Sequence, residues 1–406
     1  MNQVALAPGD RVTLALESWG RLGEAMAQHQ GWDVFVFGGI PGESVVAEVV
    51  RVHRRYAAAH TVEVLQASPD RVAPPCPYYG DCTGCQWQHL AYGRQLAVKR
   101  GLVVDALARV AGLENVSVTD TVASPDQYGY RNHARFTVRS KGSLGFVHRE
   151  TRRFVRIDRC MLMHSGINEI LTKLQDKSGD TTQLSVRAGK QTGDALIQPL
   201  IFHPELEMET GQKHYLDSVA GRRFKVSSPS FFQVNIEQAS QLIQTVKEGL
   251  GLTGNENLLD AYTGVGAIAV LLAPYVKRVL AVEESTAAVA DARENAAGLD
   301  NVEFLLGKTE DVLSRLMDSP DAVVLDPPRA GCQPAALESL VRLAPKRVAY
   351  VSCDPETLAR DLKFLCQEAY VLDRVVPLDM FPQTHHVECI AFLELAANSA
   401  RGKDSP

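Results

Sequence analysis

The chain has 406 residues, of which 45% are hydrophobic and 22% charged, and its net charge at pH 7 is -6. This length predicts two or three domains, and no segment approaches the roughly 20 apolar residues that a membrane-spanning helix needs. The first residues lack the pattern of a leader, and eight cysteines are too few for a disulfide scaffold. We therefore expect a cytoplasmic protein whose clustered cysteines bind metal or take part in chemistry.

Residues 1–68 contain several short segments of β-strand character, separated by glycine and proline. The segments are RVTLALES, WDVFVFGG, SVVAEVVRVH and HTVEVLQ. Short strands at this spacing predict a small β-barrel. Barrels of this kind commonly bind nucleic acid, and a purely structural appendage is the alternative.

The second predicted domain, residues 69–220, begins with a cysteine-bearing segment, APPCPYYGDCTGCQWQHL, before a helix expected from Leu90 to Val110. The cysteines of this segment have the spacing C-x5-C-x2-C, and a fourth follows far downstream, so the set is Cys76, Cys82, Cys85 and Cys160. Four thiolates suit zinc or an iron-sulfur cluster equally well. The spacing alone leaves both open.

The stretch from residue 131 to residue 160 reverses the overall charge, because nine Lys or Arg residues stand against two acids, a local charge of +7. Phenylalanines alternate with these cations in ARFTVRS and RRFVRID, which predicts β-hairpins with a cationic face. Such a face suits phosphate contacts, and a solvated sheet face is the alternative. The candidate contacts are Arg131, Arg135, Arg152, Arg153 and Arg156.

Residues 221–396 alternate strand and helix patterns, which predicts an α/β domain with a doubly wound, Rossmann-like parallel sheet. The tail, residues 397–406, has a disordered composition. The loop after the first strand passes through Gly264 and Gly266, and Glu283 ends the second strand, where it can accept a ribose hydroxyl. Because this loop also matches the G-x-G-x-x-A pattern of nicotinamide and flavin folds, it does not decide the cofactor.

Two later strands end in the segments VVLDPPRAG and VAYVSCDP. A nicotinamide oxidoreductase would not account for the turns DPPR and SCDP in these segments. An Asp-Pro-Pro turn is typical of methyltransferases that use S-adenosyl-L-methionine (AdoMet), in which an aromatic fourth residue stacks on a base methylated at an amino group. Arg329 stands at that position here. The missing aromatic residue favours methylation at carbon, for which Cys353 is the candidate nucleophile.

Carbon 5 of uracil is too weak a nucleophile to take a methyl group directly, so a thiolate must first add to carbon 6. A base must then remove the proton from carbon 5. The segment FPQTHHVECIAFLEL offers His385, His386 and Glu388 as bases, and we favour Glu388. The alternative makes Glu388 an edge-strand charge and the histidines loop residues.

Taken together, these motifs resemble the RNA 5-methyluridine (uracil-5-) methyltransferase family over nearly the whole chain. The resemblance implies a class I methyltransferase domain with Cys353 as nucleophile and Glu388 as base. Thr263 stands where many members have a cysteine, and we expect little consequence because that position is not the nucleophile. The resemblance implies that AdoMet is contacted by Gln233, Tyr262, Gly264, Gly266, Glu283 and Asp326.

The resemblance further implies that the four cysteines hold a structural 4Fe-4S cluster in preference to zinc, with Tyr78, Tyr79 and Trp87 nearby. Residues 1–68 are similar to the TRAM barrel, an RNA-binding module. We expect a monomer that forms 5-methyluridine in ribosomal RNA in preference to transfer RNA, without a membrane partner. The alternatives are an RNA 5-methylcytosine methyltransferase and a noncatalytic RNA-binding iron-sulfur protein. The remaining cysteines are expected to serve in packing; they are Cys332, Cys366 and Cys389.

Overall fold

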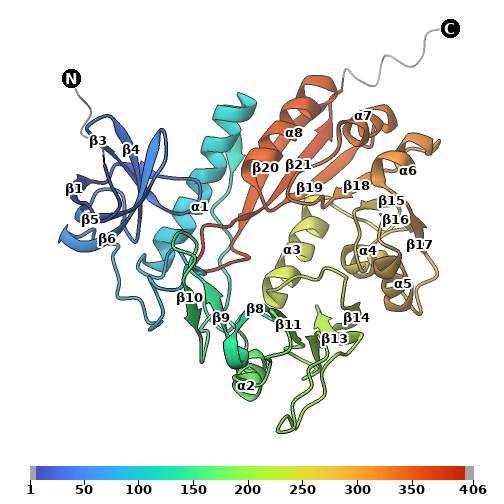
Figure 1. Ribbon diagram of the computed structural model, residues 1–406. Helices are drawn as coiled ribbons and strands as arrows, with labels where there is room; N and C mark the ends of the chain where they lie inside the picture. The colour runs from blue at the N-terminus through green and yellow to red at the C-terminus, as the bar shows by residue number, and fades with distance from the viewer. Residues whose placement is uncertain (1–5, 398–406) are drawn as a thin grey trace.

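The computed structural model describes residues 6–397, so most of the tail expected to be disordered lies outside the described residues. Figure 1 shows a small amino-terminal sheet, a central part with mixed elements, and a large carboxyl-terminal sheet with helices on both sides. None of the helices in the described residues combines the length and apolar character needed to cross a bilayer.

The amino-terminal sheet has six strands in the order β1-β5-β6-β4-β3-β2. Buried residues alternate along most of these strands, and they form a core of their own that includes Leu14, Val34, Val45 and Ala57. Each segment predicted as a strand overlaps one of β1, β4, β5 and β6, and β2 and β3 are additional strands. The bounds are β1 (Arg11–Ala15), β2 (Ser18–Trp19), β3 (Ala25–His29), β4 (Trp32–Phe37), β5 (Ser44–Val52) and β6 (Tyr56–Gln66).

The central part contains the expected long helix and the expected hairpins. Helix α1 (Tyr92–Ala106) continues into a π-helical turn over Leu107–Ala111. Five strands form a sheet in the order β10-β9-β8-β11-β12, and one face packs on α2 (Ser165–Leu174). The strands are β8 (His133–Arg139), β9 (Ser143–Val147), β10 (Phe154–Arg156), β11 (Gln183–Ala188) and β12 (Ala195–Gln198), followed by the separate hairpin β13 (His214–Val219) and β14 (Arg222–Ser227).

The large sheet confirms the predicted doubly wound α/β fold. Its eight strands follow the order β17-β16-β15-β18-β19-β21-β20-β7, and β15 to β19 are all parallel while β21 is antiparallel to both neighbours. Strands such as AVVL of β18 are continuously apolar because helices cover both faces. The bounds are β7 (Ser117–Val118), β15 (Asn257–Ala261), β16 (Arg278–Glu283), β17 (Val302–Leu306), β18 (Ala322–Leu325), β19 (Arg347–Ser352), β20 (Tyr370–Leu378) and β21 (Glu388–Leu395).

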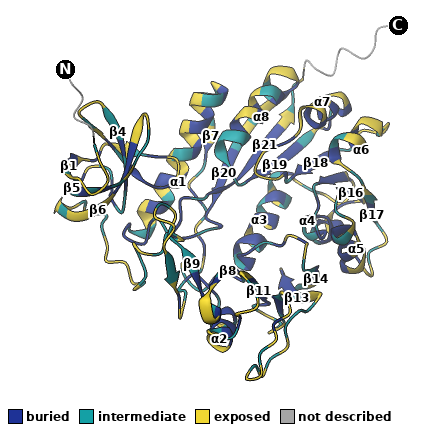
Figure 2. Ribbon diagram, in the orientation of Figure 1, coloured by how far each residue is buried: buried dark blue, intermediate teal, exposed yellow. Residues whose placement is uncertain are grey.

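Two apolar cores lie on opposite faces of this sheet, and Figure 2 shows its central strands as buried. One core packs the sheet against α3 (Ile236–Gly249), α4 (Ala267–Leu272) and α5 (Thr286–Asn295). The other core packs it against α1 together with α6 (Thr309–Arg315), α7 (Pro334–Leu343) and α8 (Pro355–Glu368). Both α1 and β7 come from the central part of the chain, yet α1 packs on the large sheet and β7 is its edge strand, so the central part is joined directly to it.

Candidate active site

The candidate residues lie where neighbouring parallel strands of the large sheet end. Asp260 is the penultimate residue of β15, and Glu283 is the last residue of β16. Asp326 and Cys353 directly follow β18 and β19. Because the carboxyl ends of parallel strands meet at one edge, the fold brings together four positions that are separated in the sequence.

The loop between β15 and α4 has the backbone conformation that its glycines suggest. Tyr262, Gly264 and Gly266 all have positive φ values, of 67°, 56° and 82°. A Cβ atom at Gly266 would lie 3.2 Å from Ala292 and 3.3 Å from Phe304, so a side chain there would crowd α5 and β17. A Cβ at Gly264 would meet no atom within 4 Å. The loop is therefore tightly packed on one side and open at Gly264.

Two carboxyl groups anchor this loop. Glu283 accepts hydrogen bonds from the backbone N–H of Gly264 at 2.9 Å and of Ser285 at 2.8 Å. Asp260 is buried, accepts hydrogen bonds from Thr263 Oγ1 and from the backbone N–H of Ala269, and has its pKa raised to about 7 by burial. Its second oxygen, Oδ1, has no partner among the described residues. The loop thus combines a free buried acceptor with an open backbone face, which fits a bound polar cofactor.

Cys353 and Glu388 lie opposite each other on adjacent strands. The antiparallel ladder of β19 and β21 has Ser352 paired with Cys389, and Cys353 and Glu388 occupy the next two positions in the same register. Side chains at opposed positions of adjacent strands are direct neighbours. The structure therefore brings together the two residues expected to act as nucleophile and base.

Burial raises the pKa of Cys353 to about 11, and the negative charges of Glu388 and Asp326 act in the same direction. Arg329 opposes them and lies 3.5 Å from Asp354, the residue that caps α8. Asp354 accepts hydrogen bonds from two backbone N–H groups of the first helical turn, each at 3.1 Å. The Asp-Pro pair of the SCDP motif thus ends the strand and starts the helix at the thiol.

Glu388 is buried, with 4% of its surface exposed. Burial raises its pKa well above the usual value, and the charge of Asp326 adds to this effect. The alternative of an edge-strand charge is excluded, because Glu388 lies on β21 between β19 and β20. A buried carboxyl group of raised pKa beside a thiol is suited to proton transfer.

The pocket at Cys353 has a volume of about 130 Å³ and is lined by the amino-terminal sheet, the end of α1 and the turn that follows it, Arg329, the segment after β19 and the loop before β21. His385 and His386 line it from the loop before β21, with ring centres 4.1 Å apart. Burial lowers the pKa of His385 to about 3 and that of His386 to about 4, so both are neutral at pH 7. Trp19 and Arg21 line it from the amino-terminal sheet. The two histidines therefore shape the pocket without adding charge.

The contribution of the amino-terminal sheet to this pocket was not expected from the sequence. Glu356, in the first turn of α8, forms ion pairs with Arg21 at 2.6 Å and with Arg109 at 2.5 Å. These contacts fix residues 19–22 beside the thiol. The sequence carries no local signal for them, because the partners are hundreds of positions apart.

Gln233 is half-buried in the segment before α3, and its backbone carbonyl accepts a hydrogen bond from Asn132 at 3.1 Å. Among the described residues, its side chain forms no hydrogen bond with the glycine loop. Tyr262 packs on the apolar core beside α7, and its hydroxyl has no partner in the described part of the chain. The structure thus gives the positions of Gln233 and Tyr262, but within residues 6–397 no contact between their side chains and the glycine loop supports a shared cofactor site.

The four clustered cysteines line one cavity of about 260 Å³, together with Tyr78 and Tyr79. Trp87 does not line it, and packs instead on Trp19 with ring centres 5.4 Å apart. Burial raises the pKa of Cys82 to about 11, and Cys160 and Cys76 raise it further, so these thiols are close enough to interact. No group of three or more His, Cys, Asp or Glu residues within 6–397 is arranged to hold a single metal ion.

Acidic residues from outside the basic stretch reduce the charge of the hairpins. Arg153 pairs with Asp81, and Arg156 pairs with Asp176 at 2.6 Å. Arg131 donates to the carbonyl of His133, whereas Arg135 and Arg152 are exposed and form no ion pair within the described residues. The local charge of +7 in the sequence therefore overstates the number of free cations.

The cationic face of the central sheet includes one residue that the sequence did not indicate. Arg187 on β11 lies opposite His133 of β8 and is only 8% exposed. Its Nη1 has no hydrogen-bond partner, and no acid of residues 6–397 pairs with it. The guanidinium lies over the ring of Tyr215, 5.9 Å from the ring centre, and without a carboxylate partner it leaves a positive charge at this face of the sheet.

The packing roles expected for the three other cysteines fit their positions. Cys332 and Cys389 are buried in the core beside α7 and α8, and Cys366 is partly buried against it. Such thiols behave as small apolar side chains.

Comparison with known proteins identifies relatives of the whole chain. A profile of the tRNA (Uracil-5-)-methyltransferase family matches residues 212–396. An uncharacterized RNA methyltransferase of Thermosynechococcus vestitus is 35% identical, with 95% of this chain and 98% of the relative covered. An uncharacterized RNA methyltransferase of Synechocystis is 34% identical, with 97% and 98% covered.

A solved structure extends this likeness to the complete fold. The tRNA (uracil-54, C5)-methyltransferase of Pyrococcus abyssi, in complex with S-adenosyl-L-homocysteine, is 27% identical and superposes with a TM-score of 0.73. The match covers 94% of this chain and all of that one. The chain therefore belongs to the tRNA (uracil-5-)-methyltransferase family and is an RNA methyltransferase.

Proposed function

We propose that the protein transfers a methyl group from AdoMet to carbon 5 of uracil in RNA, through a covalent bond between Cys353 and carbon 6. The observation that carries this proposal is the opposed placement of Cys353 and Glu388 at the carboxyl edge of the sheet. A thiol alone would suit many reactions. A thiol paired with a buried carboxyl group suits addition to a ring followed by removal of a ring proton.

The cofactor site is the edge formed by the glycine loop and the ends of β16 and β18. The open side of Gly264 and the unpartnered Oδ1 of Asp260 fit a polar cofactor there. AdoMet, when bound, supplies the methyl group. The proposed contacts are Gln233, Tyr262, Gly264, Gly266, Glu283 and Asp326, and the Pyrococcus abyssi relative supports this because its structure contains S-adenosyl-L-homocysteine.

The residues then act in sequence on the uracil ring. The Cys353 thiolate adds to carbon 6, and the electron pair moves toward carbon 5, which would take the methyl group from the sulfonium sulfur of AdoMet and leave S-adenosyl-L-homocysteine. Glu388 accepts the proton from carbon 5, the ring double bond re-forms, and the carbon–sulfur bond breaks to release the thiolate. Cys353 lines the pocket together with His385 and His386, so the target uracil must be turned out of its stack to reach the thiol.

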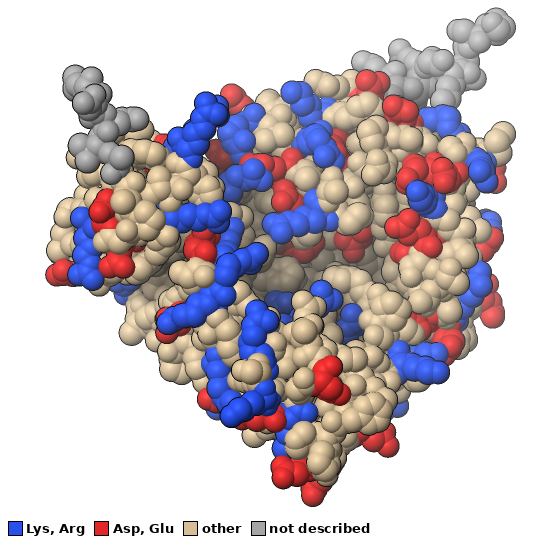
Figure 3. Space-filling model, viewed as in Figure 1, with Lys and Arg blue, Asp and Glu red and all other residues tan. Residues whose placement is uncertain are grey.

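The RNA path is proposed to cross the cationic side of the central sheet. Figure 3 shows a hollow in this face of the molecule, with Lys and Arg side chains along its left side. Arg135 and Arg152 are exposed without acid partners, and Arg187 lies buried without one. We propose that these three arginines contact phosphates, and that the amino-terminal sheet, as a TRAM-like module, continues the path beyond Trp19 and Arg21.

The cysteine cavity is proposed to hold a structural 4Fe-4S cluster. Four thiols around one cavity match the ligand number of such a cluster. Zinc is the less favoured alternative.

Ribosomal RNA stays the predicted target. The protein is proposed to act as a monomer, and its proposed domains are residues 1–68, 69–220 and 221–396. The test is incubation of the purified protein with methyl-labelled AdoMet and, separately, ribosomal and transfer RNA from a strain that lacks it. Digestion and mass spectrometry should show 5-methyluridine in ribosomal RNA. Product in transfer RNA alone would overturn the RNA class, and 5-methylcytosine would overturn the reaction.

A further inference from the structure

The loop of residues 379–387 joins β20 to β21 and leads directly to Glu388, and most of it is buried. Buried backbone groups need hydrogen-bond partners, and here other segments supply them. Five consecutive carbonyl groups accept such bonds. Gln238 donates to the carbonyl of Asp379 (3.1 Å) and Asn235 to that of Met380 (3.3 Å). Lys99 donates to Phe381 and Tyr130 to Pro382, each at 3.1 Å. The backbone N–H groups of Gln86 and Trp87 donate to Gln383 at 3.1 and 3.0 Å.

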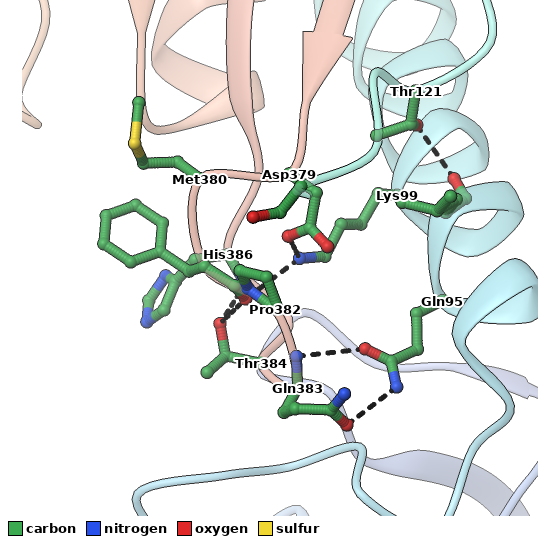
Figure 4. A network of polar contacts seen from close by, with 12 residues as sticks. Gln95, Lys99, Thr121, Asp379, Met380, Pro382, Gln383, Thr384 and His386 are labelled. Atoms are coloured by element: carbon green, nitrogen blue, oxygen red, sulfur yellow. Dashed lines mark hydrogen bonds and ion pairs between the residues drawn. The ribbon is translucent and has the colours of Figure 1, made fainter. Parts of the chain in front are cut away.

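Lys99 of α1 holds this loop at two points. Its Nζ forms an ion pair with Asp379 and donates to the carbonyl of Phe381, as Figure 4 shows. Both charged side chains are completely buried. Burial lowers the pKa of Lys99, and the charge of Asp379 opposes this. A buried ion pair adds little stability over apolar residues of similar size, so stability alone does not account for it.

Gln95, one helical turn before Lys99, holds the next part of the loop. Its Nε2 donates to Oε1 of Gln383, and its own Oε1 accepts from the backbone N–H of Gln383, each at 3.0 Å. Figure 4 shows the two side chains facing each other. Helix α1 therefore holds residues 379–383 from one side with two side chains spaced four positions apart.

We infer that Lys99 and Gln95 are positioning residues, which fix the loop so that the Glu388 carboxylate faces the proton on carbon 5 of the Cys353-bound uracil. This rests on the proposed function. Proton transfer requires the acceptor within hydrogen-bond reach. Glu388 is the first residue of β21 after this loop, so the loop sets the direction from which the chain enters the strand. A displaced Glu388 leaves methyl transfer possible but slows removal of the proton, so the carbon–sulfur bond persists.

The measured quantity is the fraction of methylated RNA that stays covalently bound to protein at steady state. This fraction does not depend on how much of the enzyme is folded. Lys99→Met should raise it at least about tenfold, because small misplacements of a reacting group slow its step strongly. Arg94→Met is the matched control on the exposed side of α1, where Arg94 only pairs with Asp70 at 3.5 Å, and it should leave the fraction unchanged.

Because Lys99→Met leaves Asp379 buried and unpaired, a second variant combines Lys99→Met with Asp379→Leu. It should recover the wild-type Tm and still show the raised fraction, since the carbonyl of Phe381 loses its donor from α1 and keeps only the bonds from Thr384 within the loop itself. A folded double variant with the wild-type fraction would overturn the inference. Glu388→Gln serves as the reference variant. If Glu388→Gln accumulates the covalent adduct and the Lys99 variants do not, only the positioning role is wrong. If Glu388→Gln does not accumulate the adduct, the assigned base and the positioning role are both wrong.

Discussion

Cys353 and Glu388 occupy opposed positions one residue beyond the last pair of the β19–β21 ladder, and the negative charge of Glu388 raises the pKa of Cys353. Their titrations are therefore coupled. While Cys353 is a thiolate, Glu388 is held more strongly in its neutral form. Conversion of the thiolate into the carbon–sulfur bond removes that charge, which lowers the pKa of Glu388 and favours the carboxylate that accepts the proton. The pair thus links the first step of the proposed reaction to the last.

Cys353→Ala should reduce turnover by roughly 10⁴-fold or more, because loss of a covalent nucleophile removes the route rather than slowing it. AdoMet affinity should change little, since the proposed cofactor contacts do not include the thiol. Methyl-transfer assays and calorimetric titration with AdoMet measure the two effects. Methylation at the wild-type rate in this variant would remove Cys353 from the mechanism.

Alkylation of Cys353 in the free protein should accelerate with rising pH up to about 11, the pKa set by burial and by Glu388 and Asp326. Only the thiolate reacts, so each pH unit below that value lowers the rate about tenfold. Arg329 lowers this pKa, so Arg329→Met should raise it and slow alkylation at pH 8. Mass spectrometry of the peptide that contains Cys353 reports the rate. Faster alkylation in Arg329→Met would contradict the assigned electrostatics.

The sequence predicted the parallel strands of the large sheet, because continuous apolar strands carry that information locally. Cys353 and Glu388 were selected from short motifs, and only the fold shows that they occupy opposed positions on neighbouring strands. The sequence did not predict Lys99 with Asp379 or Arg21 with Glu356, because such contacts depend on how distant segments meet. A partial signal for the first pair was present. Gln95, Lys99 and Val103 recur every four positions and share the buried face of α1.

The free charge of the basic stretch was overestimated for the same reason. A count along the chain includes Arg153 and Arg156 but cannot show that Asp81 and Asp176 fold against them. Burial of Arg187 was equally invisible, since a single arginine in a strand usually faces solvent.

Protein purified without oxygen should be brown and contain about four irons per chain. Replacement of Cys82 by Ser should remove the colour and most of the iron, because one of four thiolate ligands is lost. Cys366→Ser is the control, since Cys366 lies against another core and should keep the iron content unchanged. Metal analysis that finds one zinc per chain would replace the cluster with the alternative site.

Replacing Arg135 and Arg152 by Ala should weaken RNA binding and lower the slope of log affinity against log salt by about 0.7 to 0.9 for each lost phosphate contact. The modified nucleotide should not change, because phosphate contacts position the RNA without reading its sequence. Arg156→Ala should have a smaller effect, because Asp176 already pairs with that arginine. Iron content must match wild type in each variant. Equal slopes in all variants would place the RNA path elsewhere.

The most direct test of covalent methyl transfer uses Glu388→Gln, in which the adduct forms but the carbon 5 proton has no acceptor. The variant is incubated with RNA and AdoMet, digested with nuclease and protease, and analysed by mass spectrometry. The peptide that contains Cys353 should carry a uridine nucleotide with one added methyl group. A nucleotide attached to a different cysteine, or free methylated RNA with no attached nucleotide on any peptide, would contradict the assignment of Cys353 and Glu388.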